Sequence, residues 1–456
     1  MAGTPGTMMR RLTNGSFIIL LCLFLSTPYL LSGQEHSMII NDESLTYISP
    51  EREPMSGAAN TQSIVPGFSR ANNVTDPFSP VGKWRGVFLF PHELEVPFNF
   101  EVSESGQVFL LNAEERFEVG KARVEGDSLF IPIDQFDNEL VFGISSSVLH
   151  GLLRKQDKKG SPISVKAEKD KTYRFVQQPG VKSPDITGTY DIQFLSDDGR
   201  SENAVGLFKQ EGNTLSATFM RITGDSRYLQ GIVQGDTFYL SSFIGSSPVY
   251  YKGVIAGERL AGRVEGIRGG QAFTGQHNED AALPDPYRLT YLKDGYTSLD
   301  FSFPDVNGKN ISPKDEKYRN KVLIVTVTGT WCPNCIDEAA FLSPWYKENK
   351  KRGVEIISIH YERQVDSAYT HKVMDRFRKR FGIEYDEVLG GRSDKQVVAA
   401  SLPALNNFLS FPTTIIIDKK GKVAKIHTGY SGPATGKYYS MFVKEFNEDI
   451  DKLLKE

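Results

Sequence analysis

Apolar and polar residues alternate in short runs along residues 79–280, and turn residues separate one run from the next. Alternation with a period of two places apolar side chains on one face of a strand, so each run predicts a β-strand. Gly-Asp and Ser-Gly pairs between the runs are typical of tight turns in antiparallel sheets. Strands are expected at residues 84–90, 98–102, 108–112, 128–133 and 140–144. The region is therefore predicted to be an all-β, antiparallel domain.

The same region contains an internal repeat. Residues 82–84 (GKW) recur as 188–190 (GTY), residues 124–131 (VEGDSLFI) as 233–240 (VQGDTFYL), and residues 149–151 (LHG) as 260–262 (LAG). Each half supplies about five strands, and we expect the two halves to form one closed or flattened barrel, which has no exposed edges. Side chains are expected to fill its interior, with a lumen that binds an apolar ligand as the alternative.

From residue 298 the pattern changes to strands that alternate with helices. Apolar runs rich in β-branched residues predict strands at residues 322–327, 354–359, 414–417 and 423–427. Amphipathic stretches predict helices at residues 336–350, 367–381, 395–405 and 437–454. Residues 298–456 are therefore predicted to form an α/β domain with a mixed sheet covered by helices on both faces. Residues 281–297 contain two prolines and no clear period, so we expect a linker there.

The first 33 residues have the features of an export signal. Arg10 and Arg11 precede an apolar run at residues 17–25, and small residues follow at the end of the segment. We therefore expect export to the periplasm or cell envelope. Leu31 occupies a position where signal cleavage prefers a small residue, so an uncleaved membrane anchor is the alternative.

Composition narrows the remaining classes of function. The 456 residues include 39% hydrophobic and 24% charged residues, enough for two or three ordinary globular domains. Residues 34–78 are an exception, because they are rich in Ser, Asn, Pro and Glu and lack a period, and we expect a flexible arm. The net charge of −3, without a basic stripe that carries interleaved aromatic residues, argues against nucleic acid as a partner.

Two of the three cysteines, Cys332 and Cys335, stand close together after a predicted buried strand and at the start of a predicted helix. A Cys-x-x-Cys pair in this position is typical of dithiol–disulfide exchange, because the helix N-terminus favours a thiolate on the first cysteine. We expect Cys332 to attack and Cys335 to resolve. A structural disulfide is the alternative, but it usually closes a longer loop. The third cysteine, Cys22, lies in the leader.

Other uses of a Cys-x-x-Cys pair fit less well. Haem attachment needs a histidine after the second cysteine, and Ile336 stands there. Zinc needs two further ligands, but no other cysteine follows the leader and the seven histidines are scattered. We therefore expect neither a metal nor a cofactor. His360, His371 and His427 are expected to be structural or surface residues.

Further motifs surround the cysteine pair. Residues 331–335 read WCPNC, Glu338 follows three positions later, and residues 411–418 read FPTTIIID. With these motifs the C-terminal region resembles the TlpA/ResA-like branch of the thioredoxin superfamily, which is related to the AhpC/TSA proteins. The β-rich region resembles the extra N-terminal domains of exported Bacteroidetes-type proteins. Thr326 replaces the buried Asp of thioredoxins proper, as in that branch, but Ala340 stands where the branch often has Pro.

The resemblance implies a role for four residues beside the cysteine pair. Pro412 would be cis and pack against the pair, which leaves the backbone of Phe411 to bind a substrate strand. Glu338 would raise the pKa of the thiols and move protons during exchange, with a solvated helix residue as the alternative. Trp331 would cap the site and shape access to it, or would simply contribute to packing.

These observations lead to one preferred function and two alternatives. The preferred function is an exported thiol–disulfide oxidoreductase that reduces protein disulfides, with a role in redox homeostasis and antioxidant defence. It implies protein thiol and disulfide substrates and an upstream electron donor, either soluble or bound to the membrane. The alternatives are a thiol peroxidase of the peroxiredoxin type, and a ligand- or polypeptide-binding protein that uses a thioredoxin-like scaffold.

Overall fold

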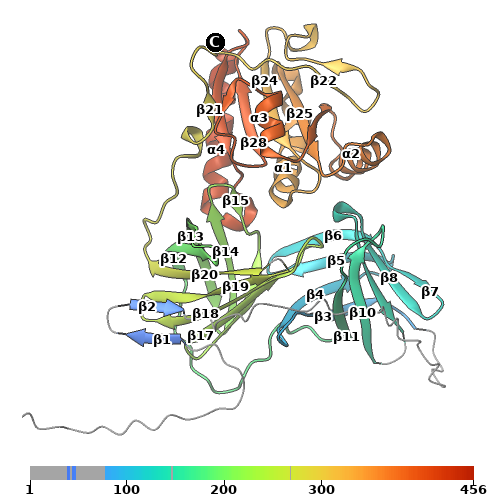
Figure 1. Cartoon of the computed structure of the whole chain (residues 1–456), viewed down its shortest axis with the longest axis vertical. Coiled ribbons are helices and arrows are strands. Elements are labelled where there is room, and N and C mark those ends of the chain that lie inside the picture. Colours follow the sequence, from blue (N-terminus) through green and yellow to red (C-terminus); the bar gives the residue numbers. More distant parts are fainter. Residues whose placement is uncertain (1–37, 42–43, 48–77, 145–146, 268) are drawn as a thin grey trace, which may run out of the picture.

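Figure 1 shows the computed structural model of the chain. It describes residues 38–41, 44–47, 78–144, 147–267 and 269–456. The predicted leader, residues 1–33, lies outside these ranges. Within the predicted flexible arm, the described strands β1 (Met38–Asn41) and β2 (Ser44–Tyr47) pair as an antiparallel hairpin. In the part of the chain that the structure describes, no helix combines the length and the apolar character needed to cross a membrane.

The first half of the β-rich region forms one nine-stranded antiparallel sheet in the order β6-β5-β4-β3-β11-β10-β9-β8-β7. Because β11 pairs with β3, the first and last strands of the half are neighbours and the sheet curls. A short 3-10 turn, η1 (Asp134–Phe136), joins β8 to β9. The strands are β3 Gly82–Leu89, β4 Glu95–Val102, β5 Gln107–Asn112, β6 Glu115–Lys121, β7 Arg123–Glu125, β8 Ser128–Ile133, β9 Asn138–Gly143, β10 Val148–Lys155 and β11 Ile163–Lys169.

The second half forms another nine-stranded sheet, in the order β13-β12-β20-β19-β18-β17-β16-β14-β15. Here β13 pairs with both β12 and β14, so the sheet closes on itself as a barrel. The strands are β12 Gly188–Ser196, β13 Ser201–Glu211, β14 Thr214–Arg221, β15 Gly224–Asp225, β16 Leu229–Gln234, β17 Thr237–Ser242, β18 Val249–Ala256, β19 Arg259–Gly266 and β20 Gly269–His277. We call the two sheets the first and second barrels.

The two barrels have corresponding strand orders, and both first strands begin at a glycine with positive φ, Gly82 at 132° and Gly188 at 145°. The expected all-β, duplicated and barrel-like architecture is confirmed. The expectation that both halves share one barrel is wrong. Each half has more strands than the apolar pattern indicated, because strands such as β6 and β11 carry many charged residues. About eight strands are enough to enclose a filled interior, so each half can form a separate sheet that curls around apolar side chains.

Aromatic side chains fill the interior of the second barrel. Phe194, Phe219 and Phe273 are buried within one apolar cluster, and Phe219 stacks on Tyr251 with ring centroids 4.9 Å apart. In the first barrel, Phe88 stacks in the same way on a neighbouring phenylalanine. This packing favours a filled interior over a lumen that binds an apolar ligand.

The C-terminal region forms a five-stranded mixed sheet in the order β26-β25-β24-β28-β29. The first three of these strands are parallel, and β28 and β29 are antiparallel to their neighbours. The strands are β24 Val322–Thr328, β25 Val354–Glu362, β26 Asp386–Arg392, β28 Thr413–Ile417 and β29 Val423–Thr428. The helices are α1 Pro333–Asn349, α2 Ser367–Phe381, α3 Lys395–Ser401 and α4 Lys437–Lys455. The predicted thioredoxin-like α/β fold is confirmed.

Both faces of this sheet are covered, as the burial of every residue of β24 indicates. One face packs on α1, α2 and α4, and the other packs on α3 and the segment before β24. The sequence pattern did not predict β26, because its seven residues include two glycines and three charged residues. The remaining short elements are β21 Tyr291–Leu292, β22 Phe303–Pro304, β23 Asn310–Ile311, β27 Leu405–Asn406, and the 3-10 turns Pro286–Arg288, Glu316–Tyr318, Lys350–Arg352 and Pro433–Thr435.

The predicted linker, residues 281–297, lies along the C-terminal domain. Its strand β21 pairs with β27, and the Lys293 amide donates to the Ala404 carbonyl at 2.9 Å. In Figure 1 both barrels lie on the same side of the C-terminal domain, with β15 and β6 closest to it. The first barrel and the C-terminal domain share one continuous apolar cluster. The barrels therefore pack against the domain that carries the cysteines.

Candidate active site

The cysteine pair lies where β24 gives way to α1. Gly329 occupies the turn because a Cβ there would approach the Trp331 ring to 2.5 Å and the Tyr361 carbonyl to 2.8 Å. Cys332 is the N-cap residue of α1, and the proline after it takes the first helical position, where its missing N–H costs nothing. The first sulfur thus lies where the free N–H groups of the helix stabilise negative charge.

Both cysteines are free thiols and both are buried. Cys332 is 7% exposed and Cys335 is fully buried. Burial raises the pKa of Cys335 well above its usual value, and Cys332 and the charge of Glu338 raise it further. The Cys332 thiol donates to the Phe411 carbonyl across 3.4 Å. The outer sulfur is therefore the one that a substrate can reach, and the inner one is kept protonated.

The Phe411–Pro412 peptide is cis, as the resemblance implied. Pro412 is buried, and Phe411 is half-buried beside the Cys332 thiol. Trp331 packs edge-on against Phe411 with ring centroids 5.5 Å apart, and its indole N–H donates to the Tyr361 carbonyl at 2.8 Å. The structure therefore brings these three predicted residues together around the first cysteine.

Glu338 lies on α1, one turn beyond the cysteines, and is 3% exposed. Glu338 is therefore buried and is not the solvated helix residue that the sequence analysis gave as the alternative. Burial raises the pKa of Glu338 to about 8, although the Thr414 hydroxyl donates to its carboxylate and acts in the opposite direction. Near neutral pH the side chain is therefore a buried acid that can give or take a proton.

Sequence reasoning missed a buried charged group at the end of β25. The Glu362 carboxylate accepts from both the amide and the hydroxyl of Thr330, each at 2.8 Å. His360 lies between Glu362 and Glu387 as an ion pair, at 3.5 Å and 3.1 Å, and Glu387 also pairs with Arg378 at 2.6 Å. Burial lowers the pKa of His360, but the two carboxylates outweigh burial and raise it to about 9.

A signal for this group is present in the sequence. Residues 357–362 read ISIHYE, so polar residues alternate with apolar ones beyond the predicted strand end at residue 359. All six are buried. Had the alternation been followed to its end, Glu362 would have been placed on the strand. The structure shows that it lies beside the cysteine loop, where its carboxylate accepts from Thr330. His371 and His427, which the sequence analysis considered with His360, take no part in this network. His371 bonds to the Ser367 carbonyl, and His427 bonds to the Gly429 carbonyl.

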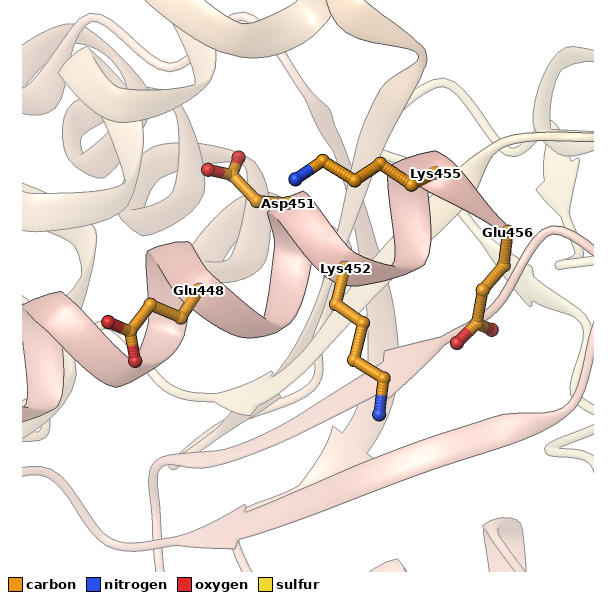
Figure 2. A pocket seen from close by; sticks show the side chains of 5 residues that line it. All are labelled: Glu448, Asp451, Lys452, Lys455 and Glu456. Carbon is orange, nitrogen blue, oxygen red and sulfur yellow. The ribbon is translucent and has the colours of Figure 1, made fainter.

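The hollow shown in Figure 2 has a volume of about 450 Å³ and lies at the end of α4. It is lined only by charged side chains: Glu448, Asp451, Lys452, Lys455 and Glu456. None of them contributes to the cysteine site described above, so this hollow adds nothing to the chemistry. Within the described residues, no cluster of His, Cys, Asp and Glu side chains could hold a metal ion.

A mixed sheet with a Cys-x-x-Cys pair at the first helix and a cis-proline opposite it defines a thioredoxin-like thiol oxidoreductase. The redoxin family model matches residues 293–440. The thiol-disulfide oxidoreductase ResA of Geobacillus thermodenitrificans is 33% identical over 136 residues, which are 30% of this chain and 69% of the relative. ResA of Bacillus subtilis is 30% identical over 138 residues, again 30% of this chain and 69% of the relative. The chain therefore belongs to the redoxin family, among its ResA-like thiol-disulfide oxidoreductases.

Solved structures of similar proteins include a thiol-disulfide oxidoreductase from Bacteroides fragilis, which is 24% identical. It covers 32% of this chain and 99% of its own, with a TM-score of 0.25. A putative protein disulfide isomerase from Bacteroides thetaiotaomicron, also 24% identical, covers 37% of this chain and 93% of its own, with a TM-score of 0.27.

Proposed function

We propose that this chain reduces protein disulfides, with Cys332 as the attacking sulfur and Cys335 as the resolving sulfur. The observation that carries the proposal is a free dithiol whose first sulfur caps a helix beside a cis-proline, while the second is buried one turn inside. Exchange needs this arrangement, because one sulfur must form the mixed disulfide and the other must displace the product.

The reaction proceeds in two balanced steps. The Cys332 thiolate attacks one sulfur of the substrate disulfide, so that a Cys332–substrate bond forms, the substrate S–S bond breaks, and the second substrate sulfur leaves and takes up a proton. Cys335 then loses its proton and attacks Cys332, which forms the Cys332–Cys335 disulfide and releases the first substrate sulfur as a thiol. Two electrons pass to the substrate, and a dithiol donor must return two electrons to the pair.

Glu338 is suited to the second step. Cys335 must be deprotonated to attack, and its pKa is raised. Glu338 is buried on the same helix and ionises near pH 8, so it is an acceptor for this proton when it is a carboxylate. Trp331 and Phe411 form the apolar wall beside the first sulfur, where we propose that the substrate strand lies.

Replacement of the attacking cysteine tests the proposal. Cys332→Ser should abolish the reduction of insulin, and Cys335→Ser should accumulate the mixed disulfide with the substrate, because nothing then resolves it. Unchanged insulin reduction by Cys332→Ser would contradict the assignment. A reduction potential near the thioredoxin value, about −270 mV, supports reduction, whereas a potential near about −120 mV reverses the proposed direction.

The two alternatives have less support. The peroxidase of the peroxiredoxin type relies on a threonine near its cysteine, and here the hydroxyl of Thr330 is bonded to Glu362. Rapid consumption of hydrogen peroxide by the reduced chain would favour it. The binding protein has little support from barrels whose interiors are filled by aromatic rings.

We propose in addition that the chain is exported to the periplasm or cell envelope. The support is the sequence of the first 33 residues, with two arginines ahead of an apolar run. Fractionation of cells with N-terminal sequencing of the mature chain tests it, and recovery of the intact N-terminus in the cytoplasm would overturn it.

A further inference from the structure

One hairpin of the second barrel extends to the C-terminal domain. β14 and β15 pair at Arg221 and Gly224, and the chain turns between them at Ile222 and Thr223. In Figure 1 this hairpin lies between the barrel and the C-terminal domain. We call residues 221–227 the covering hairpin.

The tip of the covering hairpin is bonded to both loops of the cysteine site. The Ser410 hydroxyl, just before Phe411, donates to the Thr223 carbonyl at 2.8 Å. The Asn334 side chain, which stands between the two cysteines, donates to the Asp225 carbonyl at 3.2 Å and accepts from the Asp225 amide at 3.1 Å. The hairpin backbone thus satisfies polar groups that face the place proposed for a substrate strand.

The approach of the two backbones is close. Gly224 has a φ of +133°, and a Cβ there would meet the Asn334 amide group at 1.6 Å and the Tyr430 carbonyl at 3.2 Å. On the other side, a Cβ at Gly429 would meet the Ile222 carbonyl at 2.8 Å. Both glycines have a positive φ, and at Gly429 the close neighbours are backbone atoms of the hairpin, so the hairpin is closely fitted to this surface.

Arg227, at the base of the covering hairpin, fastens it to α1. Its guanidinium donates to the Pro333 carbonyl at 3.0 Å and pairs with Asp337 at 2.5 Å. It also donates to Glu115 of the first barrel at 3.1 Å. The Arg227 and Glu115 side chains are each 9% exposed. One buried cation therefore joins both barrels to α1, the helix that Cys332 caps, and its removal would leave buried carboxylates unpaired.

The first barrel reaches the same site from η1. The Gln135 side chain donates to the Thr330 carbonyl at 2.5 Å. The next loop carries Asp137, which accepts from the Tyr369 hydroxyl at 3.0 Å and pairs with Arg376 at 3.1 Å, both on α2. The barrels therefore contact the cysteine loop on either side of Cys332.

These contacts have a consequence for substrates. A thiolate attacks a disulfide along the line of the S–S bond, so the substrate must present its sulfur directly to Cys332. With the covering hairpin bonded to Ser410 and Asn334, Cys332 is only 7% exposed. A polypeptide strand needs the surface beside Ser410 and Asn334 that the hairpin occupies, whereas a small disulfide needs much less of it.

We propose that the covering hairpin determines which disulfides react: it admits small disulfides to Cys332 and excludes polypeptide disulfides until it leaves the cysteine site. The substrate side of this inference rests on the proposed function. The structural side, that the hairpin controls access to the Cys332 sulfur, does not.

Gly224→Ala tests the inference in the full chain. The added Cβ occupies the place of the Asn334 amide group, so the Asn334 side chain must turn away and give up its two hydrogen bonds to Asp225. The positive φ of +133° also disfavours any Cβ there, so the hairpin is held less firmly on the cysteine site. The matched control is Gly257→Ala, in a turn of the same barrel with a φ of +61° and nothing within 4 Å of the added Cβ. It introduces an unfavourable backbone conformation without the collision. Arg227→Met is the second opening variant if Gly224→Ala does not fold. Arg263→Met is its control, since Arg263 is also buried but pairs with Asp197 and Glu265 inside the second barrel, away from the hairpin.

The first measurement is the alkylation of Cys332 in a Cys22→Ser, Cys335→Ser background, with iodoacetamide and with a maleimide on a polyethylene glycol chain. Gly224→Ala should raise the rate of the bulky reagent about tenfold, which equals about 1.4 kcal/mol in the equilibrium between covered and open site. The iodoacetamide rate should change less than about twofold, well under 1.4 kcal/mol. An unchanged ratio of the two rates in Gly224→Ala and Arg227→Met would overturn the proposal.

The second measurement compares the reduction of insulin and of oxidised glutathione by chains with both active cysteines and a dithiol donor. Opening should speed the reduction of insulin far more than that of oxidised glutathione. If the alkylation ratio changes but no variant reduces insulin, the cover stands and the proposed function fails. If insulin is reduced equally fast by wild type and Gly224→Ala, and the alkylation ratio is unchanged, the proposed function stands and the cover fails.

Discussion

At the residue scale, the site combines two buried groups that hold protons near neutral pH. Burial raises both the pKa of Cys335 and that of Glu338, the latter to about 8. Their charged forms repel each other, because the Glu338 charge is one of the causes that raise the pKa of Cys335. The state in which only one of the two groups is charged is therefore more stable than the state in which both are. A proton that leaves Cys335 is best accepted by the Glu338 carboxylate.

Glu338→Gln should change the pH profile of the resolving step. In wild type the rate should rise as Glu338 ionises near pH 8; in the variant this inflection disappears and the rate falls about tenfold or more, as for the loss of a general base. The remaining inflection, from Cys335, should move to lower pH, because a neighbouring negative charge has been removed. Stopped-flow release of a fluorescent thiol from the mixed disulfide measures it. Glu348→Gln, an exposed change on the same helix, should leave the profile unchanged.

The residues that sequence reasoning found are those that local motifs specify. The cysteines, Glu338 and Pro412 stand at fixed spacings in two short segments, so a single sequence could indicate them. Arg227 could not be found in this way, because its partners Glu115 and Asp337 are more than a hundred residues away on either side and only the folded chain brings them together.

At the element scale, the end of β25 supports the cysteine loop. Glu362 fixes the amide and the hydroxyl of Thr330, two residues before Cys332. His360 holds Glu362 from the other side, and its raised pKa means that it is charged at neutral pH. A charged strand end therefore positions the loop that begins α1.

Glu362→Gln should show this coupling in the titration of His360. Loss of one of the two carboxylates should move the pKa of His360 down from about 9, which NMR of the ring protons measures. Because the folded-state pKa of His360 is raised, its contribution to stability is present below about pH 6.5 and is lost as pH rises through about 9. Wild type should thus lose unfolding free energy between pH 6.5 and 9, and the variant should lose less of it.

Urea unfolding at the two pH values gives the stability difference. Glu384→Gln is the control, because Glu384 is exposed and pairs with Lys350 at the surface. If Glu362→Gln leaves both the His360 titration and the pH dependence of stability unchanged, the network does not have the role assigned to it.

The strand elements show where pattern reasoning fails. Strands that alternate strictly, such as β5 and β8, were predicted within a residue or so, because one face is buried. β7 was missed because all three of its residues are exposed, and β26 because its glycines and charges hide the apolar residues. Whether each half had enough strands for a barrel of its own depended on weakly patterned strands such as β6, β7 and β11.

At the scale of the whole molecule, the two barrels act as one body that carries both contacts to the cysteine loop. The segment between them carries Arg174, which is buried and donates to Asn99 at 3.1 Å and Asn112 at 3.2 Å in the first barrel, and to the Ser241 carbonyl at 2.8 Å in the second. Every one of these acceptors is neutral. The guanidinium is therefore held by hydrogen bonds across the junction and not by an ion pair.

Arg174→Met should weaken this junction and, through it, the cover over Cys332. The variant leaves the Asn99 side-chain oxygen without a donor and removes one of the two donors of the Asn112 oxygen, which also accepts from the Phe243 amide. Hydrogen bonds to a charged group are worth about 1.5–3 kcal/mol each, so unfolding free energy should fall by about 3 kcal/mol. Within the described residues, all of the hydrogen bonds of Arg174 go to the two barrels and none goes to the C-terminal domain. A weaker junction between the barrels should nevertheless loosen their two contacts with the cysteine loop, which are the covering hairpin and Gln135. Alkylation of Cys332 by the bulky maleimide should therefore accelerate. Urea unfolding measures the loss of stability, and the alkylation assay measures the access to Cys332 on the same sample.

The control is Arg200→Met, at the surface of the second barrel, which should change neither the unfolding free energy nor the alkylation rate. A variant that loses stability while Cys332 stays as protected as in wild type would show that the barrels hold the two contacts independently.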